Sequence, residues 1–363
     1  MKRKRILAMI LAVASCLSLA VSASAASTTT RKATDFRDYD RTAWYAEAVS
    51  AAVDNGLLYG KSSTVIDPNG AMTRAEMAAI INRSFGCYKT ADISQYKDVS
   101  KDKWYYKDVA LAVQMGTYNG RSASSMAPDA PISRQEAMTV VARALELDYD
   151  AYAKTDLTAF SDRGKISDWA LPYVRAMVGA DYIHGRGKVL APQDDITRAE
   201  FAQIFANIIG SYITVKGTYD KDIKGSVLVR TDDVILKDMT VDGDLIIGCG
   251  AADGKIVLDN VTIKGRLLTW GGGTKAVYCN NGTSTPEVIA ARVDDAVKII
   301  FDRDSTLAVI DSIKARITER AKQNKETEII FYDVSGLREA QKQLNAIVAD
   351  NQIDITAPAH LYA

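Results

Sequence analysis

One arginine recurs three times inside the same short sequence, at a place where a cation can bind an anion. The three copies are Thr73-Arg74-Ala75-Glu76, Ser133-Arg134-Gln135-Glu136 and Thr197-Arg198-Ala199-Glu200. A hydroxyl residue followed three positions later by glutamate is typical of a helix N-terminus, where each of the two side chains caps the other residue's amide. The helix dipole disfavours a cation in the first turn, so the arginine needs another explanation. A guanidinium beside free helix amides is a candidate site for a carboxylate or a phosphate.

The arginines also have a plainer explanation, which is an ion pair on the protein surface. Asp38 is a candidate partner for Arg74. For the third copy we expect Thr197 and Glu200 to cap the helix. We expect the Arg198 side chain to be exposed, so that it contributes less than about 0.5 kcal/mol to stability.

The arginine motif is the last part of a longer repeat that occurs three times, about 60 residues apart. Each repeat opens with an aromatic residue two positions before an aspartate. A tryptophan follows, then a glycine sixteen residues later, and then a proline five residues before the motif. These residues are Phe36, Trp44, Gly60 and Pro68; Tyr96, Trp104, Gly120 and Pro128; and Phe160, Trp169, Gly185 and Pro192. The pattern predicts two helices around a glycine-bearing loop, with the first helix of the first repeat at 43–55.

These residues resemble the S-layer homology family of Gram-positive, clostridial-type bacteria. The family pattern is an aromatic-x-Asp opening, a tryptophan at the start of the first helix, a loop glycine, a proline and an Ile-Thr-Arg-Ala-Glu signature. The resemblance covers 36–210, as repeats at 36–86, 96–147 and 160–210. The departures are small: Met72 for the isoleucine, Ser133 and Gln135 in the second repeat, and one extra residue between Asp162 and Trp169.

The resemblance implies a fold, a ligand and a set of binding residues. The fold is an all-α pseudo-trimer, and its grooves bind a secondary cell wall polymer on peptidoglycan, often through pyruvylated amino sugars. The implied polymer-binding residues are Trp44, Gly60, Arg74, Trp104, Gly120, Arg134, Trp169, Gly185 and Arg198. The arginines would meet the ketal carboxylate, the glycines would let the sugar approach the backbone, and the tryptophans would form the groove wall. A tryptophan at a helix start is also commonly a core residue, and His184 is either a solvated loop residue or a groove contact.

The first 25 residues have the pattern of a secretory signal peptide. Four basic residues precede an apolar run over 6–21, and Ala23-Ser24-Ala25 fits a cleavage site. The alternative is a lipoprotein with a lipidated Cys16, because Val13-Ala14-Ser15-Cys16 resembles a lipobox. No later segment has the ~20 apolar residues of a membrane helix. We therefore expect a secreted protein at the cell wall or cell surface, without a membrane span.

The composition argues against several other functions. Lys+Arg and Asp+Glu both number 45, so the whole chain has no net charge. Without the four basic residues of 1–25, the remaining chain has a net charge of −4. A nucleic-acid-binding protein needs a clustered excess of Lys and Arg, which this chain lacks. His184 and His360 lie too far apart in sequence to favour a catalytic triad or a multi-histidine zinc site. Cys87, Cys249 and Cys279 are an odd number, so we expect free thiols rather than a disulfide framework or a metal cluster, and no cofactor.

From Tyr212 onward, helical periodicity gives way to β-branched residues with Gly and Asp turns. Residues 234–245 align with 256–267 at an offset of 22, and a looser copy at 277–283 follows at an offset of 21. The repeat predicts the stacked rungs of a parallel β-solenoid over 212–304. An antiparallel β-sandwich is the alternative.

The offset places Leu236, Leu258 and Cys279 in one internal column of the solenoid. The stretch is similar to a β-rich module that follows S-layer homology repeats in many clostridial surface proteins, a similarity that carries no known chemistry. Helical periodicity returns after Val297, with a helical face of Leu307, Ile310, Ile313 and Ile317. A strand is expected at 328–332 and a helix at 337–349, so 305–363 is a candidate α/β cap over the last rung.

An enzymatic function is the alternative to a purely structural C-terminal half. Parallel β-helices include polysaccharide lyases and hydrolases, and Asp242, Asp244, Asp259 and Arg266 are candidates to line an outer groove. Aspartate beside glycine at strand turns is far more often turn chemistry. We therefore expect a non-enzymatic protein anchored to a wall polymer, with a β-rich surface or assembly module that contacts other surface-layer proteins. A wall-anchored polysaccharide-active enzyme is the second hypothesis.

Overall fold

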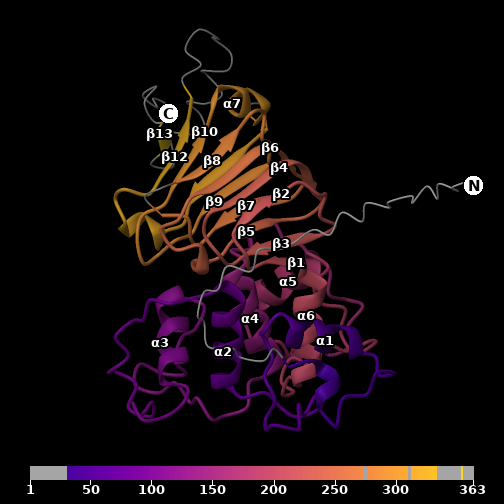
Figure 1. The fold of residues 1–363 in the computed structure, drawn as a ribbon. Coiled ribbons are helices and arrows are strands. Elements are labelled where there is room, and N and C mark those ends of the chain that lie inside the picture. The colour runs from indigo at the N-terminus through magenta and orange to yellow at the C-terminus, as the bar shows by residue number, and fades with distance from the viewer. Residues whose placement is uncertain (1–30, 274–275, 310–311, 333–352, 355–363) are drawn as a thin grey trace, which may run out of the picture. The chain divides into compact units, whose positions relative to one another are not determined.

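The computed structural model describes residues 31–273, 276–309, 312–332 and 353–354. The predicted signal peptide, Cys16 and the helix expected over 337–349 lie outside the described residues. A helical region comes first and a region of parallel strands follows it, which confirms the predicted order of the two fold types (Figure 1).

Each repeat contributes two α-helices, one on each side of its glycine-bearing loop, as predicted. They are α1 (Ala46–Asp54) and α2 (Arg74–Phe85), α3 (Tyr106–Met115) and α4 (Arg134–Ala144), and α5 (Leu171–Gly179) and α6 (Arg198–Ile208). Two short 3-10 helices, η1 (Ala33–Asp35) and η2 (Arg163–Lys165), lie in the openings of the first and third repeats. Helix α1 begins three residues later than expected, because residues 43–45 form a turn.

The second helix of every repeat begins with the predicted capping box. In the first repeat the Glu76 amide donates to Thr73 Oγ1 over 3.2 Å, and the Thr73 amide donates to Glu76 Oε2 over 2.9 Å. The same reciprocal bonds join Ser133 to Glu136 and Thr197 to Glu200. The capping role of these six residues is therefore confirmed, and the boxes fix where α2, α4 and α6 begin.

The three repeats close into a ring, which we call the helical ring (α1 to α6 and their loops). The first helix of each repeat packs on the second helix of the preceding repeat, in the pairs α3 with α2, α5 with α4 and α1 with α6. At the centre, the amides of Met72, Ile132 and Ile196 donate in turn to the carbonyls of Ile196, Met72 and Ile132, each over 3.0 Å. All three side chains are fully buried. The apolar residue before each capping box therefore forms the axis of the ring.

Strands β1 to β12 after the ring alternate between two parallel sheets. The first sheet has the order β1 (Ile209–Ile213), β3 (Ser226–Val229), β5 (Leu245–Ile247), β7 (Arg266–Thr269), β9 (Glu287–Ala290) and β11 (Lys314–Ile317). The second has β2 (Gly217–Tyr219), β4 (Val234–Val241), β6 (Ile256–Ile263), β8 (Val277–Asn280), β10 (Lys298–Phe301), β12 (Glu328–Phe331) and β13 (Ile353–Asp354). The pairings among these described strands are parallel, so the antiparallel sandwich is wrong. Short helices η3 (Cys249–Ala251), α7 (Arg303–Val309) and η4 (Ala321–Gln323) lie in the connections.

The predicted internal column is present in the second sheet. Leu236 pairs with Leu258, and Leu258 pairs with Cys279, and all three side chains are fully buried. The column continues through Phe301 and Phe331, whose rings stack with centroids 4.9 Å apart. The offset from Cys279 to Phe301 is again 22 residues, and the next is 30.

The first sheet is buried on both faces, because the helical ring packs on its outer side. Outward-facing Leu228, Ile246, Leu268 and Ile289 join the hydrophobic core of the ring. Their neighbours in sequence point inward and pack with the column of the second sheet. The continuous apolar runs of β3, β5 and β7 follow from this burial on two sides.

Of the helix expected through Leu307, Ile310, Ile313 and Ile317, Ile310 lies outside the described residues, and the part that reaches Ile317 is wrong. Helix α7 ends at Val309, and β11 continues the first sheet by pairing with β9. Ile313 and Ile317 are four residues apart, a separation that suits one face of a strand as well as one face of a helix. The expected strand at 328–332 is confirmed as β12.

A charge placed inside the column should unfold the β-region. We expect Leu258→Asp to abolish the cooperative unfolding transition of this region, because a carboxylate between buried apolar neighbours has no partner. Lys264→Asp is the control, since the Lys264 side chain is 61% exposed and its ion pair with Asp242 is a surface pair. Circular dichroism of the full chain during heating measures both. Equal damage from the two changes would show that the inner and outer faces are assigned wrongly.

Candidate functional site in three grooves of the helical ring

Three grooves lie between neighbouring repeats, and each is lined by residues of all three repeats. Their volumes are about 360, 390 and 280 Å³. Each holds a loop glycine, the capping glutamate that follows it, the tryptophan of the next repeat and the arginine of the preceding repeat. The first groove contains Gly60, Glu76, Trp104 and Arg198; the second Gly120, Glu136, Trp169 and Arg74; and the third Gly185, Glu200, Trp44 and Arg134. Each groove therefore contains three of the nine predicted binding residues: one glycine, one tryptophan and one arginine.

The three tryptophans are exposed, which excludes the alternative that they belong to the core. Trp44 is 62% exposed, Trp104 60% and Trp169 51%. Tyr45 and Tyr105, which follow Trp44 and Trp104, are buried instead. In each pair the tyrosine and indole rings are edge-on, with centroids about 5.5 Å apart. Tyr45 and Tyr105 therefore occupy the core positions and leave the indole faces of Trp44 and Trp104 accessible at the grooves.

The three arginines are buried, which contradicts the expectation of exposed side chains. Arg74 is 5% exposed, Arg134 4% and Arg198 3%. Each Nε donates over 2.8 Å to a backbone carbonyl of the following repeat: Met126, Leu190 and Ile66 respectively. Each side chain therefore crosses from one repeat into the next, and only its tip reaches the floor of a groove.

The carboxylate partner of each arginine is the capping glutamate of the following repeat. The pairs are Arg74 with Glu136 at 2.9 Å, Arg134 with Glu200 at 3.0 Å and Arg198 with Glu76 at 3.6 Å. The predicted partner Asp38 is wrong. Its carboxylate accepts the amides of Ile66 and Asp67 instead, over 2.9 and 2.7 Å. One glutamate thus caps a helix and joins two repeats.

The helix amides beside the arginines are not free, so that part of the anion-site hypothesis is also wrong. In α2 the Arg74 amide donates to the Ala130 carbonyl and the Ala75 amide to the Pro128 carbonyl, both over 2.9 Å. Equivalent bonds occupy the first amides of α4 and α6. These helix amides therefore do not bind an anion in a groove, and the side-chain cations are the candidates to do so.

Each groove has a second cation that the sequence analysis did not identify. Lys61, Arg121 and Arg186 follow the loop glycines directly, and each contacts the groove's glutamate from the solvent side. The distances are 2.5 Å to Glu76, 3.4 Å to Glu136 and 2.6 Å to Glu200. The sequence could have identified these cations, because a basic residue directly follows the loop glycine in all three repeats. Each glutamate is thus held between a buried and an accessible cation.

The third groove carries fewer cations than the other two. Arg83 in the first groove lies over the Tyr59 ring at 4.0 Å, and Arg143 in the second lies over Tyr173 at 5.0 Å. The equivalent residue of the third groove is Asn207. His184 lines this groove, 61% exposed and 3.4 Å from the Asp181 carboxylate. We infer that an anion is held less strongly in the third groove.

The loop glycines are required by packing inside their own repeat. A Cβ on Gly60 would lie 2.4 Å from the Phe36 ring and 2.4 Å from the Ser62 carbonyl oxygen. Gly120 has the same relation to the Tyr96 ring, at 2.5 Å. The glycine and the aromatic residue that opens the repeat are therefore matched to each other, whether or not a ligand is bound.

The three groove glutamates are stabilised in their charged form. Burial alone would raise the pKa of Glu76, but hydrogen bonds from Lys61 and the Thr73 amide, and the charge of Arg198, lower it overall. At Glu136 and Glu200 burial also raises the pKa, but the capping amides and the neighbouring arginines lower it by more, so the net shift is downward. A pKa lowered by folding stabilises the native state above the unfolded pKa and loses that contribution as pH falls.

We therefore expect the helical ring to lose stability in acid. The temperature at the midpoint of thermal unfolding should be nearly constant from pH 7 to 6. It should decrease at pH values below 4.5, the ordinary pKa of glutamate, because these carboxylates are then protonated. Melting curves from pH 7 to 3 measure this. Glu136→Gln should show a smaller fall than the unchanged chain. A ring that melts higher at pH 4 than at pH 7 would contradict the ion-pair account.

The carboxylates considered for catalysis in the β-region do not converge. Asp244 pairs with Arg266 at 2.6 Å, and Lys264 Nζ lies 2.6 Å from Asp242. Asp259 faces Lys237 at 3.6 Å. In the part of the chain that the structure describes, no cluster of three or more His, Cys, Asp or Glu is arranged to hold a metal ion. Among the same residues, no helix is both long and apolar enough to cross a membrane.

Comparison with known proteins gives the repeats a family. The model of the S-layer homology domain matches residues 35–78, 95–138 and 159–202. The Surface-layer 125 kDa protein of Lysinibacillus sphaericus is 32% identical over 57% of this chain and 17% of its own length. Exoglucanase XynX of Acetivibrio thermocellus is 28% identical over 49% of this chain and 16% of its own length. S-layer protein sap of Bacillus anthracis is 28% identical over 41% of this chain and 17% of its own length. The chain thus spans less than a fifth of each of these relatives.

Proposed function

We propose that this chain, a cell-surface protein with three S-layer homology domains, is held at the cell wall by the three grooves of its helical ring. The ligand is the secondary cell wall polymer on peptidoglycan, with pyruvylated amino sugars as the bound groups. One observation carries the proposal: an exposed tryptophan and two cations share a groove, three times over. An aromatic face suits the apolar face of a sugar ring, and the cations suit a carboxylate.

In the first groove each side chain has a distinct task. Trp104 packs against the sugar ring, and Lys61 and Arg83 meet the ketal carboxylate from the accessible side. The Arg198 guanidinium forms the floor, where it holds Glu76 and the Tyr59 carbonyl and adds positive charge beneath the ligand. The tryptophans and arginines of the nine implied residues thus bind the polymer, the arginines while they also join the repeats, and the glycines let the sugar approach the backbone.

Co-sedimentation with purified wall sacculi tests this function. The chain should pellet with sacculi that carry the secondary polymer. It should stay in the supernatant when the polymer has been extracted and bare peptidoglycan remains. Addition of the soluble polymer should release bound chain in proportion to its concentration. Equal pelleting with both kinds of sacculi would show that peptidoglycan, rather than the polymer, is the ligand.

For the C-terminal half we propose a non-enzymatic surface or assembly module. We propose a β-solenoid over 212–304 with an α/β cap over 305–363, after repeats at 36–86, 96–147 and 160–210. Within the range proposed for the cap, strands β11 and β12 extend both sheets. Parallel pairing, alternation between two sheets and the internal column support the solenoid. Contact with other surface-layer proteins is the role that suits it.

The second hypothesis is a wall-anchored polysaccharide-active enzyme. Relatives named as an exoglucanase and an amylopullulanase favour it, the latter from Thermoanaerobacterium thermosulfurigenes. The candidate carboxylates argue against it, because each is neutralised by a different cation at a separate place. Release of reducing sugar from wall polysaccharides by the full chain, lost in Asp244→Asn, would favour the enzyme.

A further inference from the structure

Two cysteines that are far apart in sequence lie together between the helical ring and the β-region. Cys87 follows the end of α2, and Cys249 begins η3, 162 residues later. Their sulfur atoms are 3.3 Å apart, and the Met115 sulfur lies 3.6 Å from that of Cys87. Both cysteines are partly exposed, whereas Cys279 is fully buried in the column of the second sheet.

A glycine next to each cysteine lets the two backbones approach. Gly86 has a φ of +69°, a conformation that favours glycine, and a Cβ built on it would lie 2.8 Å from the Gly250 Cα. A Cβ on Gly250 would lie 2.3 Å from the Arg230 carbonyl oxygen. Side chains at these positions would push the ring and the β-region apart. The short distance between the sulfur atoms thus depends on two glycines that contact each other.

The interface around the two cysteines is fixed by side chains of the β-region that cap helices of the ring. Arg230 donates to the carbonyls of Arg83 and Asn55 over 2.9 and 3.0 Å, near the ends of α2 and α1. The Trp270 indole donates to Ala144 over 2.9 Å, and Arg320 to Met115 over 2.9 Å, at the ends of α4 and α3. Cations at helix C-termini are favoured by the helix dipole.

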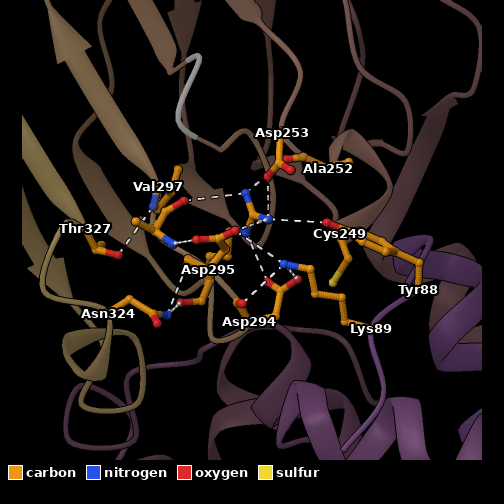
Figure 2. Close-up of polar contacts among 12 residues, drawn as sticks. Tyr88, Lys89, Cys249, Ala252, Asp253, Asp294, Asp295, Val297, Asn324 and Thr327 are labelled. Carbon is orange, nitrogen blue, oxygen red and sulfur yellow. Dashed lines mark hydrogen bonds and ion pairs between the residues drawn. The ribbon is translucent and has the colours of Figure 1, made fainter.

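A second group of polar contacts lies beside Cys249 (Figure 2). In it, Tyr88 and Lys89 of the ring meet residues of the β-region. The buried Arg292 guanidinium donates to Asp253 over 2.7 Å and to the Tyr88 hydroxyl over 3.3 Å. Lys89 lies 3.5 Å from the Asp294 carboxylate. The residue after Cys87 and the loop after Cys249 are thereby fixed relative to each other.

We propose that Cys87 and Cys249 are a redox pair that forms a disulfide at the cell surface and joins the wall-binding ring covalently to the β-region. Structural disulfides persist in such oxidising surroundings. The oxidant is a small disulfide such as oxidised glutathione. The thiolate of one cysteine attacks it, forms a mixed disulfide and releases one thiolate. The second cysteine then attacks the protein sulfur of the mixed disulfide and releases the other. Two protein thiols are oxidised, the small disulfide is reduced to two thiols, and these take up the two protons.

Both cysteines are partly exposed. They also line a small cavity of about 20 Å³, room for about one water molecule, together with Tyr88, Met115 and Trp270. A disulfide closed over so long a segment restricts the unfolded chain strongly. Its formation should therefore raise the midpoint of thermal unfolding by at least about 5 °C. The proposal is independent of polymer binding in the grooves.

Peptide mapping of the full chain tests the redox pair. The reduced protein is incubated with oxidised glutathione, remaining thiols are alkylated, and the chain is denatured and digested with trypsin. We expect one cross-linked species that joins the Cys87 and Cys249 peptides, and a rise in melting temperature that reducing agent reverses. Cys279→Ser should keep both results, and Cys249→Ser should lose both.

Gly250→Val is a variant that retains all the thiols, and it should give little cross-link because it separates the two backbones. Circular dichroism verifies that each variant is folded before oxidation. Alkylated Cys87 and Cys249 without a cross-link, in natively folded protein after prolonged oxidation, would overturn the proposal. A cross-link to Cys279 instead would overturn it as well.

Discussion

Arg198→Ala is expected to lower the free energy of unfolding of the chain by about 3 kcal/mol, the usual loss when one partner of a buried ion pair is removed. The Arg198 side chain is 3% exposed and donates to the carbonyls of Ile66 and Tyr59 as well as facing Glu76. Its removal leaves these carbonyls without their donor and Glu76 without its inner cation. Urea unfolding of the full chain, followed by circular dichroism, measures the loss.

Lys61→Ala is the matched control, because Lys61 contacts the same glutamate from the solvent side. Its side chain is 35% exposed, so we expect a loss of less than about 1 kcal/mol. Thr197→Ala should lie between the two, at about 1 kcal/mol for a lost N-cap. If Arg198→Ala and Lys61→Ala cost the same, the inner arginine does not join the repeats.

Replacing all three tryptophans by alanine is expected to weaken co-sedimentation with polymer-bearing sacculi by more than about 100-fold. Each groove loses its aromatic wall, and losses of about 1 kcal/mol or more in each of three grooves multiply when a chain binds a polymer through all three. Trp44, Trp104 and Trp169 are more than half exposed, so the melting temperature should change by only a few degrees.

Val215→Ala is the control for the tryptophan series, since Val215 is 67% exposed and lies outside the three grooves. It should bind sacculi like the unchanged chain. A triple tryptophan variant that still pellets fully would show that the grooves are not where the polymer binds. A variant that loses both binding and its native circular dichroism spectrum would show that the tryptophans hold the ring together.

Features set by local sequence could be predicted. The capping boxes depend on residues three positions apart, and the strand register follows from the offset of 22 between Leu236 and Leu258. Both are decided by neighbours along the chain or by an exact repeat. The helix expected through Ile317 failed because a four-residue separation suits two secondary structures.

Features set by contacts between repeats could not be predicted. Arg74 is buried by Met126 and Glu136 of the next repeat, so its burial depends on how the ring closes. The second cation of each groove was visible in the sequence as a basic residue after the glycine, yet its partner was not. The approach of Cys87 to Cys249 depends on where the β-region docks, which no local pattern encodes.

Calorimetric titration of the full chain with a short fragment of the soluble polymer tests the central claim, that each groove is a separate polymer site. Trp104→Ala removes the wall of the first groove alone. With a fragment of the polymer too short to reach two grooves at once, we predict that the number of bound fragments falls by one and that the affinity of the remaining grooves is unchanged. An unchanged number of sites in Trp104→Ala, or no difference between the variant and the unchanged chain in heat released, would contradict the assignment of the grooves.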